Sequence, residues 1–513
     1  MAGLRRSLNV VVALLAPVTA LVAPSFVDPA AAVTPGVGFT ADPAPTYQLN
    51  GIGWSVAVAN GVIYVGGTFS AVRPPGAAPG QHETGRRNFV ALNAATGRPT
   101  GCRLSFTGTA ASVRALAVSP DRRTLYAGGH FTAVNGRPVK NLAAVNLVAC
   151  RPVATFRPRV SSWVHGLAVA PSGTVYAAGE FVTVNGVARQ HFAAVSPTGA
   201  LLRWHPVADH TGYAVAVTPN GAAVVLGGAF DTVDGADSHA LAVVSPRIGA
   251  LLHRYAGHFV PARSRVKALV ADATGIYTGN EGTGKGVFDG RIALDPRTFR
   301  QRWRDTCLGA TQDVLVDRGV VYAASHAHNC ASMGGFPDGR RRHLTVEGIA
   351  DPHLKVWWPD TNGGIGEALG PRALAVAIRA GHRYLVAVGE FTTVNGRPQQ
   401  GILRLPDSPD TGAPSAPSAL AADAGAVGRI ALTWRAGTDR DDRTLIYRVF
   451  RNSSAVPLAT VRANSDWWRR PQVSYVDRSV KPGATYTYRI TARDGTGNTS
   501  RGTVVTVRAR SAP

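Results

Sequence analysis

The chain has 513 residues, 45% hydrophobic and 17% charged, so it contains enough apolar material for a packed globular body. Glycine (57) and proline (34) are abundant without a collagen-like period, which excludes a triple helix and indicates many tight turns between short strands. The formal net charge of +23 favours anionic partners, but the basic residues are scattered along the chain, which argues against specific nucleic-acid recognition.

Residues 1–32 have the pattern of a secretory signal peptide. The basic pair Arg5-Arg6 comes first, residues 8–22 are mostly apolar, and three alanines ending at Ala32 follow. We expect cleavage after Ala32, since the apolar stretch is short and interrupted by proline; an uncleaved anchor is the alternative. No later stretch approaches about 18 consecutive apolar residues, so we expect a secreted, extracellular chain without membrane attachment, beginning with a lead-in over 33–44.

A repeated unit runs through residues 45–408. Each copy has an alternating apolar segment such as 113–118, then a glycine-bearing strand, an Asn-Gly or Asp-Gly turn and a further apolar strand. Such turns are strong hairpin signals, because both central residues of a type I′ turn need positive φ. The copies are anchored by Gly67, Gly129, Gly179, Gly228, Gly279, Ala324 and Gly389.

Seven four-stranded units at intervals of about 45 to 65 residues predict an all-β, seven-bladed β-propeller, with an open solenoid or two sandwiches as the alternative. We expect the glycine strand to lie nearest the axis, where a Cβ would meet the neighbouring blade. Residues 45–50 are expected to close the ring as the outer strand of the last blade.

The repeat also resembles a known family. The pattern Gly-Gly-x-Phe-Thr-x-Val-Asn-Gly at 128–136, followed by Leu-Ala-Ala-Val-Asn at 142–146, resembles the β-propeller repeat of secreted actinobacterial proteins that often carry a fibronectin type III domain. The resemblance implies the fold and carries over no catalytic residue.

The four cysteines are expected to form disulfides, because an even number in an exported chain favours pairing. Three connectivities are possible. We favour Cys102–Cys150 and Cys307–Cys330, because each pair lies in neighbouring repeats.

Two groups of residues have the chemistry of metal ligands. His326, His328 and Cys330 alternate, which places them on one face of a strand, and with Cys307 they have the ligand types of a zinc site. In an oxidising compartment the thiols are expected to pair instead. Asp231, Asp234 and Asp237 have calcium-ligand chemistry but lie on a hairpin turn, where aspartate is favoured anyway. We therefore expect no metal.

The glycine-rich segment 279–286 has most of a phosphate-binding loop. It lacks the final Ser or Thr and no helix follows, so it is interpreted as a turn between strands, and we expect no cofactor.

Aromatic and basic side chains are the candidate ligand-binding residues, since exposed tryptophan stacks on sugar rings and arginine pairs with anionic groups. Packing between the two domains is the alternative role for the tryptophans. The candidates are Trp357, Trp358, Trp467, Trp468, His326, His328, Arg340, Arg341 and Arg342.

A Pro/Ser-rich linker at 409–418 precedes a C-terminal domain at 419–511. Trp434 at the end of an alternating strand and Tyr486 in a later one resemble the core tryptophan and the tyrosine corner of fibronectin type III domains.

No catalytic residue can be named, because we find neither a nucleophile elbow nor a paired-carboxylate signature; Glu180 and Glu390 occupy equivalent repeat positions. The leading hypothesis is a secreted, monomeric binding or scaffold protein whose propeller face binds a glycan, a cell-wall polymer or a protein. The alternative is a carbohydrate-active enzyme, a glycosidase or lyase in polysaccharide degradation. Two or three acids at the mouth of the central channel would support that alternative. We expect any specialised site within residues 279–343, where the repeats diverge.

Overall fold

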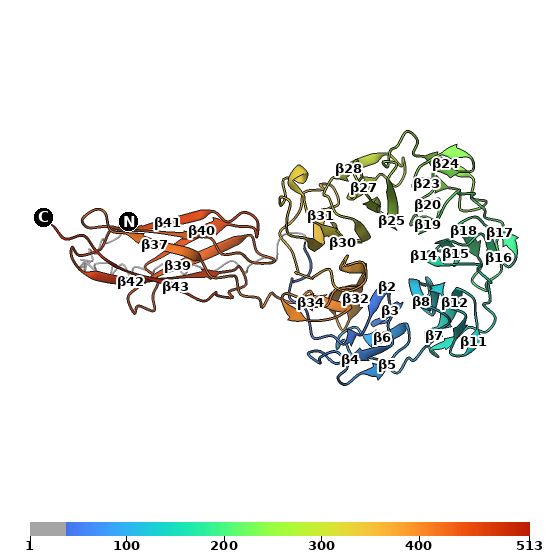
Figure 1. The fold of residues 1–513 in the computed structure, drawn as a ribbon, viewed down its shortest axis with the longest axis horizontal. Coiled ribbons are helices and arrows are strands. Elements are labelled where there is room, and N and C mark those ends of the chain that lie inside the picture. Colours follow the sequence, from blue (N-terminus) through green and yellow to red (C-terminus); the bar gives the residue numbers. More distant parts are fainter. Residues whose placement is uncertain (1–36, 513) are drawn as a thin grey trace, which may run out of the picture.

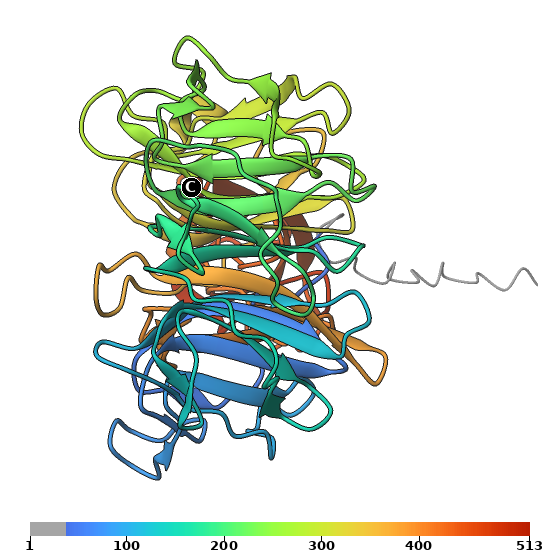
Figure 2. The same ribbon diagram turned by 90° about the vertical axis from the view of Figure 1, so that its right-hand side faces the viewer.

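The computed structural model describes residues 37–512. The expected signal peptide and the first residues of the lead-in lie outside the described residues. The described chain is all-β apart from one short 3-10 helix, η1 (Ala331–Met333). Figure 1 shows a ring of sheets joined to an elongated C-terminal sandwich, and Figure 2 shows the ring edge-on. Within residues 37–512, no helix is long and apolar enough to cross a membrane.

The ring consists of consecutive antiparallel sheets of three or four strands each. From the axis outward, the sheets are β2 (Ile52–Ala59), β3 (Val62–Thr68) and β6 (Phe89–Asn93); β8 (Ser112–Val118), β9 (Thr124–His130), β12 (Leu142–Asn146) and β13 (Arg151–Pro152); β14 (Val164–Val169), β15 (Val175–Gly179) and β18 (Phe192–Val195); β19 (Gly212–Val217), β20 (Val224–Gly228), β23 (Leu241–Val244) and β24 (Leu251–Arg254); β25 (Ser264–Ala271), β26 (Ile276–Gly282), β27 (Arg291–Leu294) and β28 (Gln301–Asp305); β29 (Thr311–Asp317), β30 (Val320–Ala327) and β31 (Arg342–Gly348); and β32 (Pro371–Arg379), β33 (His382–Gly389) and β36 (Ile402–Pro406).

The innermost strands close a circle. Each of β2, β8, β14, β19, β25 and β29 contacts the first strand of the next sheet, and β32 contacts both β29 and β2 (Figure 1). This arrangement confirms an all-β body of the propeller type.

The glycine-bearing strand is the second of each sheet rather than the one nearest the axis, which corrects the sequence-based expectation. Its glycines are nevertheless needed for close packing. A Cβ on Gly66 would lie 2.4 Å from Cγ1 of Val113 in the next sheet, and a Cβ on Gly67 would lie 2.2 Å from the Ile52 carbonyl oxygen. The crowding therefore arises between β3 and the two innermost strands beside it.

Sets of two or three short strands lie on the outside of the ring, and the Asn-Gly and Asp-Gly turns join strands within these sets. Asn135 and Gly136 have φ values of 50° and 74°, as a type I′ turn requires. These strands are β1 (Gln48–Leu49), β4 (Ala71–Arg73) and β5 (Thr84–Gly85); β7 (Phe106–Thr107), β10 (Ala133–Val134) and β11 (Arg137–Pro138); β16 (Thr183–Val184) and β17 (Val187–Ala188); β21 (Thr232–Val233) and β22 (Ala236–Asp237); and β34 (Thr393–Val394) and β35 (Arg397–Pro398).

The N-terminal segment lies along β36 of the last sheet. The backbone N–H groups of Thr40, Ala44 and Leu49 donate to the carbonyls of Pro406 (2.9 Å), Arg404 (2.8 Å) and Gln400 (3.0 Å). Residues 40–44, rather than the expected 45–50, therefore lie beside β36. Within 45–50, Leu49 reaches Gln400 just before β36, and the two-residue strand Gln48–Leu49 pairs with β4, which corrects the expected outer strand of the last sheet.

One buried cluster of charges joins two neighbouring sheets. Arg291 in β27 is 1% exposed and forms ion pairs with Asp305 in β28 and Glu347 in β31, which are 0% and 1% exposed. Arg291 Nε also donates to Glu347 Oε1 at 2.7 Å. Burial raises the pKa of Glu347 well above its ordinary value, and the guanidinium opposes this shift. One cation therefore holds two buried carboxylates.

Both expected disulfides are present. Cys102 is bonded to Cys150 and Cys307 to Cys330, with sequence separations of 48 and 23 residues. Because Cys307 and Cys330 are bonded to each other, they supply no thiolate to a zinc ion.

The C-terminal part is a β-sandwich of two antiparallel sheets. Trp434 is 1% exposed in its core, 5.7 Å from the ring of Tyr447, and the Tyr486 hydroxyl accepts the Lys481 N–H at 2.8 Å. The sheets are β37 (Ser418–Asp423), β38 (Ile430–Arg435) and β41 (Gln472–Asp477); and β40 (Ala459–Asn464), β39 (Thr444–Arg451), β42 (Thr485–Arg493) and β43 (Thr503–Arg508).

Candidate binding site at the ring axis

Every innermost strand of the ring is interrupted at the same place. The register against the second strand shifts by one residue, for example between Val113 and Ala115 in β8. Such a β-bulge leaves one residue unpaired and redirects its side chain. The bulged residues, here called the axial ring, are Trp54, Arg114, His165, Tyr213, Lys267, Gln312 and Arg372.

These bulged residues surround a single pocket. All of them, together with Glu367, line a cavity of about 250 Å³. Each sheet thus contributes one side chain to the same site, although the residues are spread over more than 300 positions of the sequence. Polar and aromatic groups line the pocket, so the channel is neither apolar nor glycine-lined.

Arg114 lies among aromatic rings. Its guanidinium carbon is 3.7 Å from the centroid of Trp54 and 5.2 Å from that of Trp163, and its Nε donates to the Ser112 hydroxyl at 3.0 Å. Within residues 37–512, Arg114 forms no ion pair with a carboxylate. Burial lowers the pKa of Arg114 to about 10, which leaves it cationic at neutral pH.

Lys267 is the second basic side chain of the pocket. Its Nζ lies 4.3 Å from the ring centroid of Tyr213, and burial lowers its pKa against the opposing charge of Glu281. In the described part of the chain, Nζ has neither a hydrogen bond nor an ion pair of its own. The pocket therefore contains two basic side chains that no carboxylate of the described chain contacts directly.

Around the axial ring, His165 lies between Arg114 and Lys267. Its ring is 6.2 Å from Trp163 and 5.5 Å from Tyr213, and its Nε2 is 2.9 Å from Glu180 Oε1. A carboxylate only accepts hydrogen bonds, so Nε2 carries the proton and Nδ1 keeps the lone pair. Burial lowers the pKa of His165, which favours the neutral imidazole, while burial raises the pKa of Tyr213 and keeps its phenol protonated.

Other arginines at the axis are neutralised by glutamates. Arg372 donates to Glu390 and to Glu367, each at 2.6 Å, and to Gln312 Oε1 at 2.7 Å. Glu281 accepts from Gln312 Nε2 at 2.7 Å and forms an ion pair with Arg265. Its burial is outweighed by Lys267, Gln312 and Arg265, so the pKa of Glu281 is lowered and the carboxylate is ionised.

The tryptophans singled out in the sequence lie where the ring meets the sandwich. Trp357 is 2% exposed and packs on Tyr322 at 5.4 Å. The rings of Trp467 and Trp468 are 5.1 and 5.9 Å from Phe336. Their faces are thus occupied by protein side chains.

The basic and histidine candidates are placed in the same region. Arg342 stacks on Trp467 at 4.0 Å and on Trp358 at 4.8 Å, and it pairs with Asp360 at 2.6 Å. Arg340 also pairs with Asp360, whereas Arg341 is exposed. His326 and His328 lie 6.5 Å apart, and His328 pairs with Asp338 at 3.0 Å. None of these residues lines the axial pocket.

The glycine-rich segment 279–286 begins in a strand, and the hairpin aspartates Asp231, Asp234 and Asp237 all have hydrogen-bond partners. β26 runs through Gly282, and residues 283–290 form a connection without a helix. Asp231 pairs with His239 at 2.7 Å, while Asp234 and Asp237 accept backbone N–H groups of Val207 and Gly257. Each aspartate thus has a separate partner around the hairpin.

Sequence reasoning missed the axial ring. Arg114, His165 and Lys267 stand second in segments that were read as alternating apolar strands. The available signal was that this position holds a large polar or aromatic residue in successive copies. Aligning the copies by their innermost strands would have exposed it.

No protein-family model matches the chain. An α-amylase of Niallia circulans is 32% identical over 123 residues, which is 23% of this chain and 8% of the amylase, so the chain spans a small part of that relative. The structure of Saccharomyces cerevisiae Sqt1 is similar over 72% of this chain and 100% of its own, with 12% identity and a TM-score of 0.43. A chain of the mitotic checkpoint complex is similar over 77% of this chain and 98% of its own, with 13% identity and a TM-score of 0.42.

Proposed function

We propose that the chain is an exported, seven-bladed β-propeller with a C-terminal fibronectin type III domain, and that its axial ring binds an acidic saccharide. The observation that carries this proposal is the convergence of Arg114 and Lys267, neither in contact with a carboxylate, on one polar pocket at the axis. We infer a uronate-bearing extracellular or cell-wall polysaccharide as the ligand.

The chemistry of a uronate matches the lining of the pocket. The carboxylate of a uronate forms charge-assisted hydrogen bonds with a guanidinium. Its hydroxyl groups are hydrogen-bond donors and acceptors, which suits a pocket lined by polar side chains such as His165 and Gln312. A buried cation without a counter-charge is costly, and a bound carboxylate would relieve that cost at Arg114. The cavity of about 250 Å³ lies just below the range of roughly 300–1,000 Å³ typical of drug-sized ligands, so it suits one or two sugar residues.

Calorimetry with short oligouronates, compared with neutral oligosaccharides of the same length, tests the proposal. A charge-assisted hydrogen bond contributes roughly 1.5–3 kcal/mol, so R114Q should weaken oligouronate binding by about 10- to 150-fold. Arg254, exposed on the outer strand β24, supplies the matched control R254Q, which should bind as the wild type does. Equal affinity for neutral sugars, or equal weakening by both variants, would overturn the proposal.

A second candidate function is cleavage of the same ligand by β-elimination. The favouring observation is a neutral His165 beside a protonated Tyr213, within a pocket that also holds Arg114 and Lys267. Neutralising the uronate carboxylate with Arg114 makes the C5 proton more acidic, and a neutral imidazole is able to accept it. The C5–H and C4–O4 bonds break, a C4=C5 double bond forms, and the Tyr213 hydroxyl protonates the leaving oxygen.

Elimination is favoured over hydrolysis because the buried glutamates form ion pairs with arginines. Glu281 and Glu390 are held by arginines, which leaves them poor general acids. Elimination yields an unsaturated, ultraviolet-absorbing end without uptake of water, and mass spectrometry separates it from the hydrolysis product. H165Q should abolish the absorbance while retaining binding. If the wild type binds the ligand but forms no unsaturated product, the lyase function is excluded and the binding function stands.

A further inference from the structure

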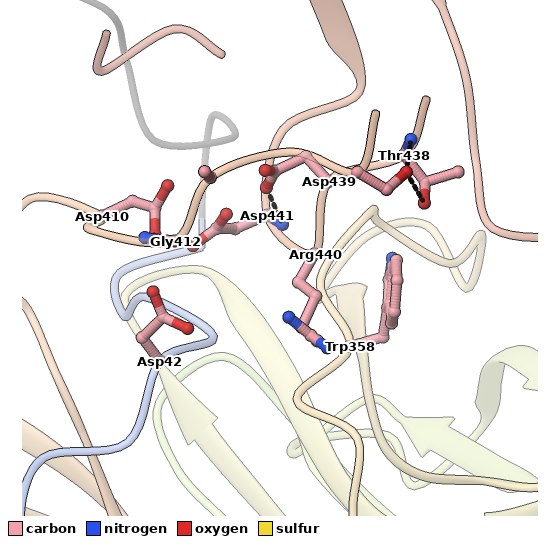
Figure 3. Close-up of a pocket in the computed structure, with 10 residues that line it drawn as sticks. Asp42, Trp358, Asp410, Gly412, Thr438, Asp439, Arg440 and Asp441 are labelled. Atoms are coloured by element: carbon pink, nitrogen blue, oxygen red, sulfur yellow. Dashed lines mark hydrogen bonds between the residues drawn. The ribbon is translucent and has the colours of Figure 1, made fainter. Parts of the chain in front are cut away.

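A second polar pocket lies at the joint between the ring and the sandwich. It has a volume of about 280 Å³, and its lining includes Asp42 from the N-terminal segment, Asp410 from the linker, and Asp439 and Asp441 from the loop between β38 and β39 (Figure 3). Arg440, between the last two in sequence, points instead toward the ring of Trp358, 5.6 Å away. The pocket therefore presents carboxylates on one side and an arginine-stacked tryptophan on the other.

Four aspartates of this region converge on one point. Asp410, Asp439, Asp441 and Asp442 each offer a carboxylate oxygen that lies within 4.8 Å of the other three. The first three side chains belong to residues that are 7%, 5% and 5% exposed. In the described part of the chain, Asp410, Asp439 and Asp442 form no ion pair with arginine or lysine.

The electrostatic cost of this arrangement is large. Four carboxylates each place an oxygen within 4.8 Å of the others, and three of them belong to buried residues. Like charges brought together out of water need either protons or a counter-ion.

A buried carboxylate beside the cluster supplies an independent indication of a bound cation. Asp494 is 1% exposed, and its Oδ2 has no hydrogen-bond partner among residues 37–512. Its Oδ1 accepts the N–H groups of Gly497 and Asn498 at 2.6 and 2.8 Å. The charge of Asp494 acts on Asp442, and the neighbouring Gly495 N–H donates to Asp442 Oδ2 at 3.4 Å. An orphaned buried oxygen of this kind calls for a missing ligand.

The set of ligands favours calcium. Calcium takes six to eight oxygen ligands at about 2.3–2.6 Å in flexible geometry, and carboxylates are prominent among them. Magnesium demands a near-ideal octahedron at about 2.0–2.1 Å and usually keeps several waters, with only one or two carboxylates from the protein. We propose that Asp410, Asp439, Asp441 and Asp442, with Asp494 beside them, bind a calcium ion that fixes the sandwich to the ring.

The surrounding contacts show what such an ion would hold together. The Thr40 hydroxyl and the Ala41 N–H both donate to Asp441 Oδ2 at 3.1 Å, and Thr40 itself is bonded to Pro406 at the end of β36. Asn498 Nδ2 donates to Asp410 Oδ2 at 3.2 Å. One ion would thus connect the N-terminal segment, the linker and two loops of the sandwich.

Calcium titration of the full mature chain, after removal of metals with a chelator, tests the proposal. We expect binding heat with CaCl₂, a higher melting temperature, and slower proteolysis of residues 407–417, which connect β36 to β37. MgCl₂ should bind at least tenfold more weakly. D237N, which changes an exposed hairpin aspartate with a single backbone partner, is the matched control and should behave as wild type.

The stability of D439N relative to the wild type should change in opposite directions with and without calcium. The variant removes one of the repelling carboxylates, so in chelator it should be at least as stable as the wild type. In excess calcium it should be less stable, with at least a tenfold loss of calcium affinity. If D439N does not fold, the half-buried Asp442 offers D442N with the same expectation. Absence of calcium binding by the wild type, equal magnesium affinity, or unchanged affinity in both variants would overturn the proposal.

Discussion

Replacing Arg291 by methionine removes the one cation held between Asp305 and Glu347. Both carboxylates stay buried, at 0% and 1% exposure, and neither gains a new positive partner. Removing one member of a buried ion pair costs about 3–5 kcal/mol, and here two carboxylates depend on one guanidinium. We therefore expect R291M to lower the free energy of unfolding of the ring by about 4–5 kcal/mol.

Denaturant unfolding, followed by both tryptophan fluorescence and circular dichroism, measures this loss. The variant R291M/E347Q should recover part of it, because one buried charge is removed, and replacing all three residues by apolar ones should approach wild-type stability. R291M removes the guanidinium that opposes the raised pKa of Glu347, so the deficit of R291M should be larger at a pH where Glu347 of the wild type is ionised than at a pH where it is protonated. A loss below about 1 kcal/mol, or no recovery in R291M/E347Q, would refute the reasoning.

Two further predictions concern the stability of the ring. Removing the Cys102–Cys150 bond with C102A/C150A opens a loop with a sequence separation of 48, so urea unfolding should show a loss of about 4 kcal/mol, and unchanged stability would contradict it. Burial lowers the pKa of His343 to about 4, so its stabilising contribution is complete above pH ~6.5 and is lost as the pH falls toward ~4. The melting temperature should therefore drop over that window, and H343N, which keeps a donor for the Thr361 carbonyl, should make the drop shallower.

The repeated architecture was predictable because its signals are local. Gly66 and Gly67 are needed where β3 passes close to its neighbours, and Asn135-Gly136 adopts the positive φ values that its turn requires. Such requirements act within one or two strands, so they leave a readable pattern in each copy. The order of strands from the axis was wrong because the same crowding affects the second strand as well as the first.

The two polar pockets were not predictable for the opposite reason. The shared role of Arg114 and Lys267 exists only after sheets from distant parts of the chain have closed into a ring. Asp410 and Asp439 meet only after the linker has folded against the loops of the sandwich. Neither convergence leaves a spacing in the sequence that differs from ordinary strands and loops.

The bulges at the axis make substitutions in the pocket independent of the strand pairing. Because each bulged residue is unpaired in its own ladder, its identity is not constrained by the hydrogen bonds that hold the sheet together. Single-codon changes can therefore alter the pocket one position at a time while the scaffold persists. A lineage with this architecture can vary the lining of the pocket without first acquiring compensating mutations, and the same property makes these positions a compact library for directed evolution.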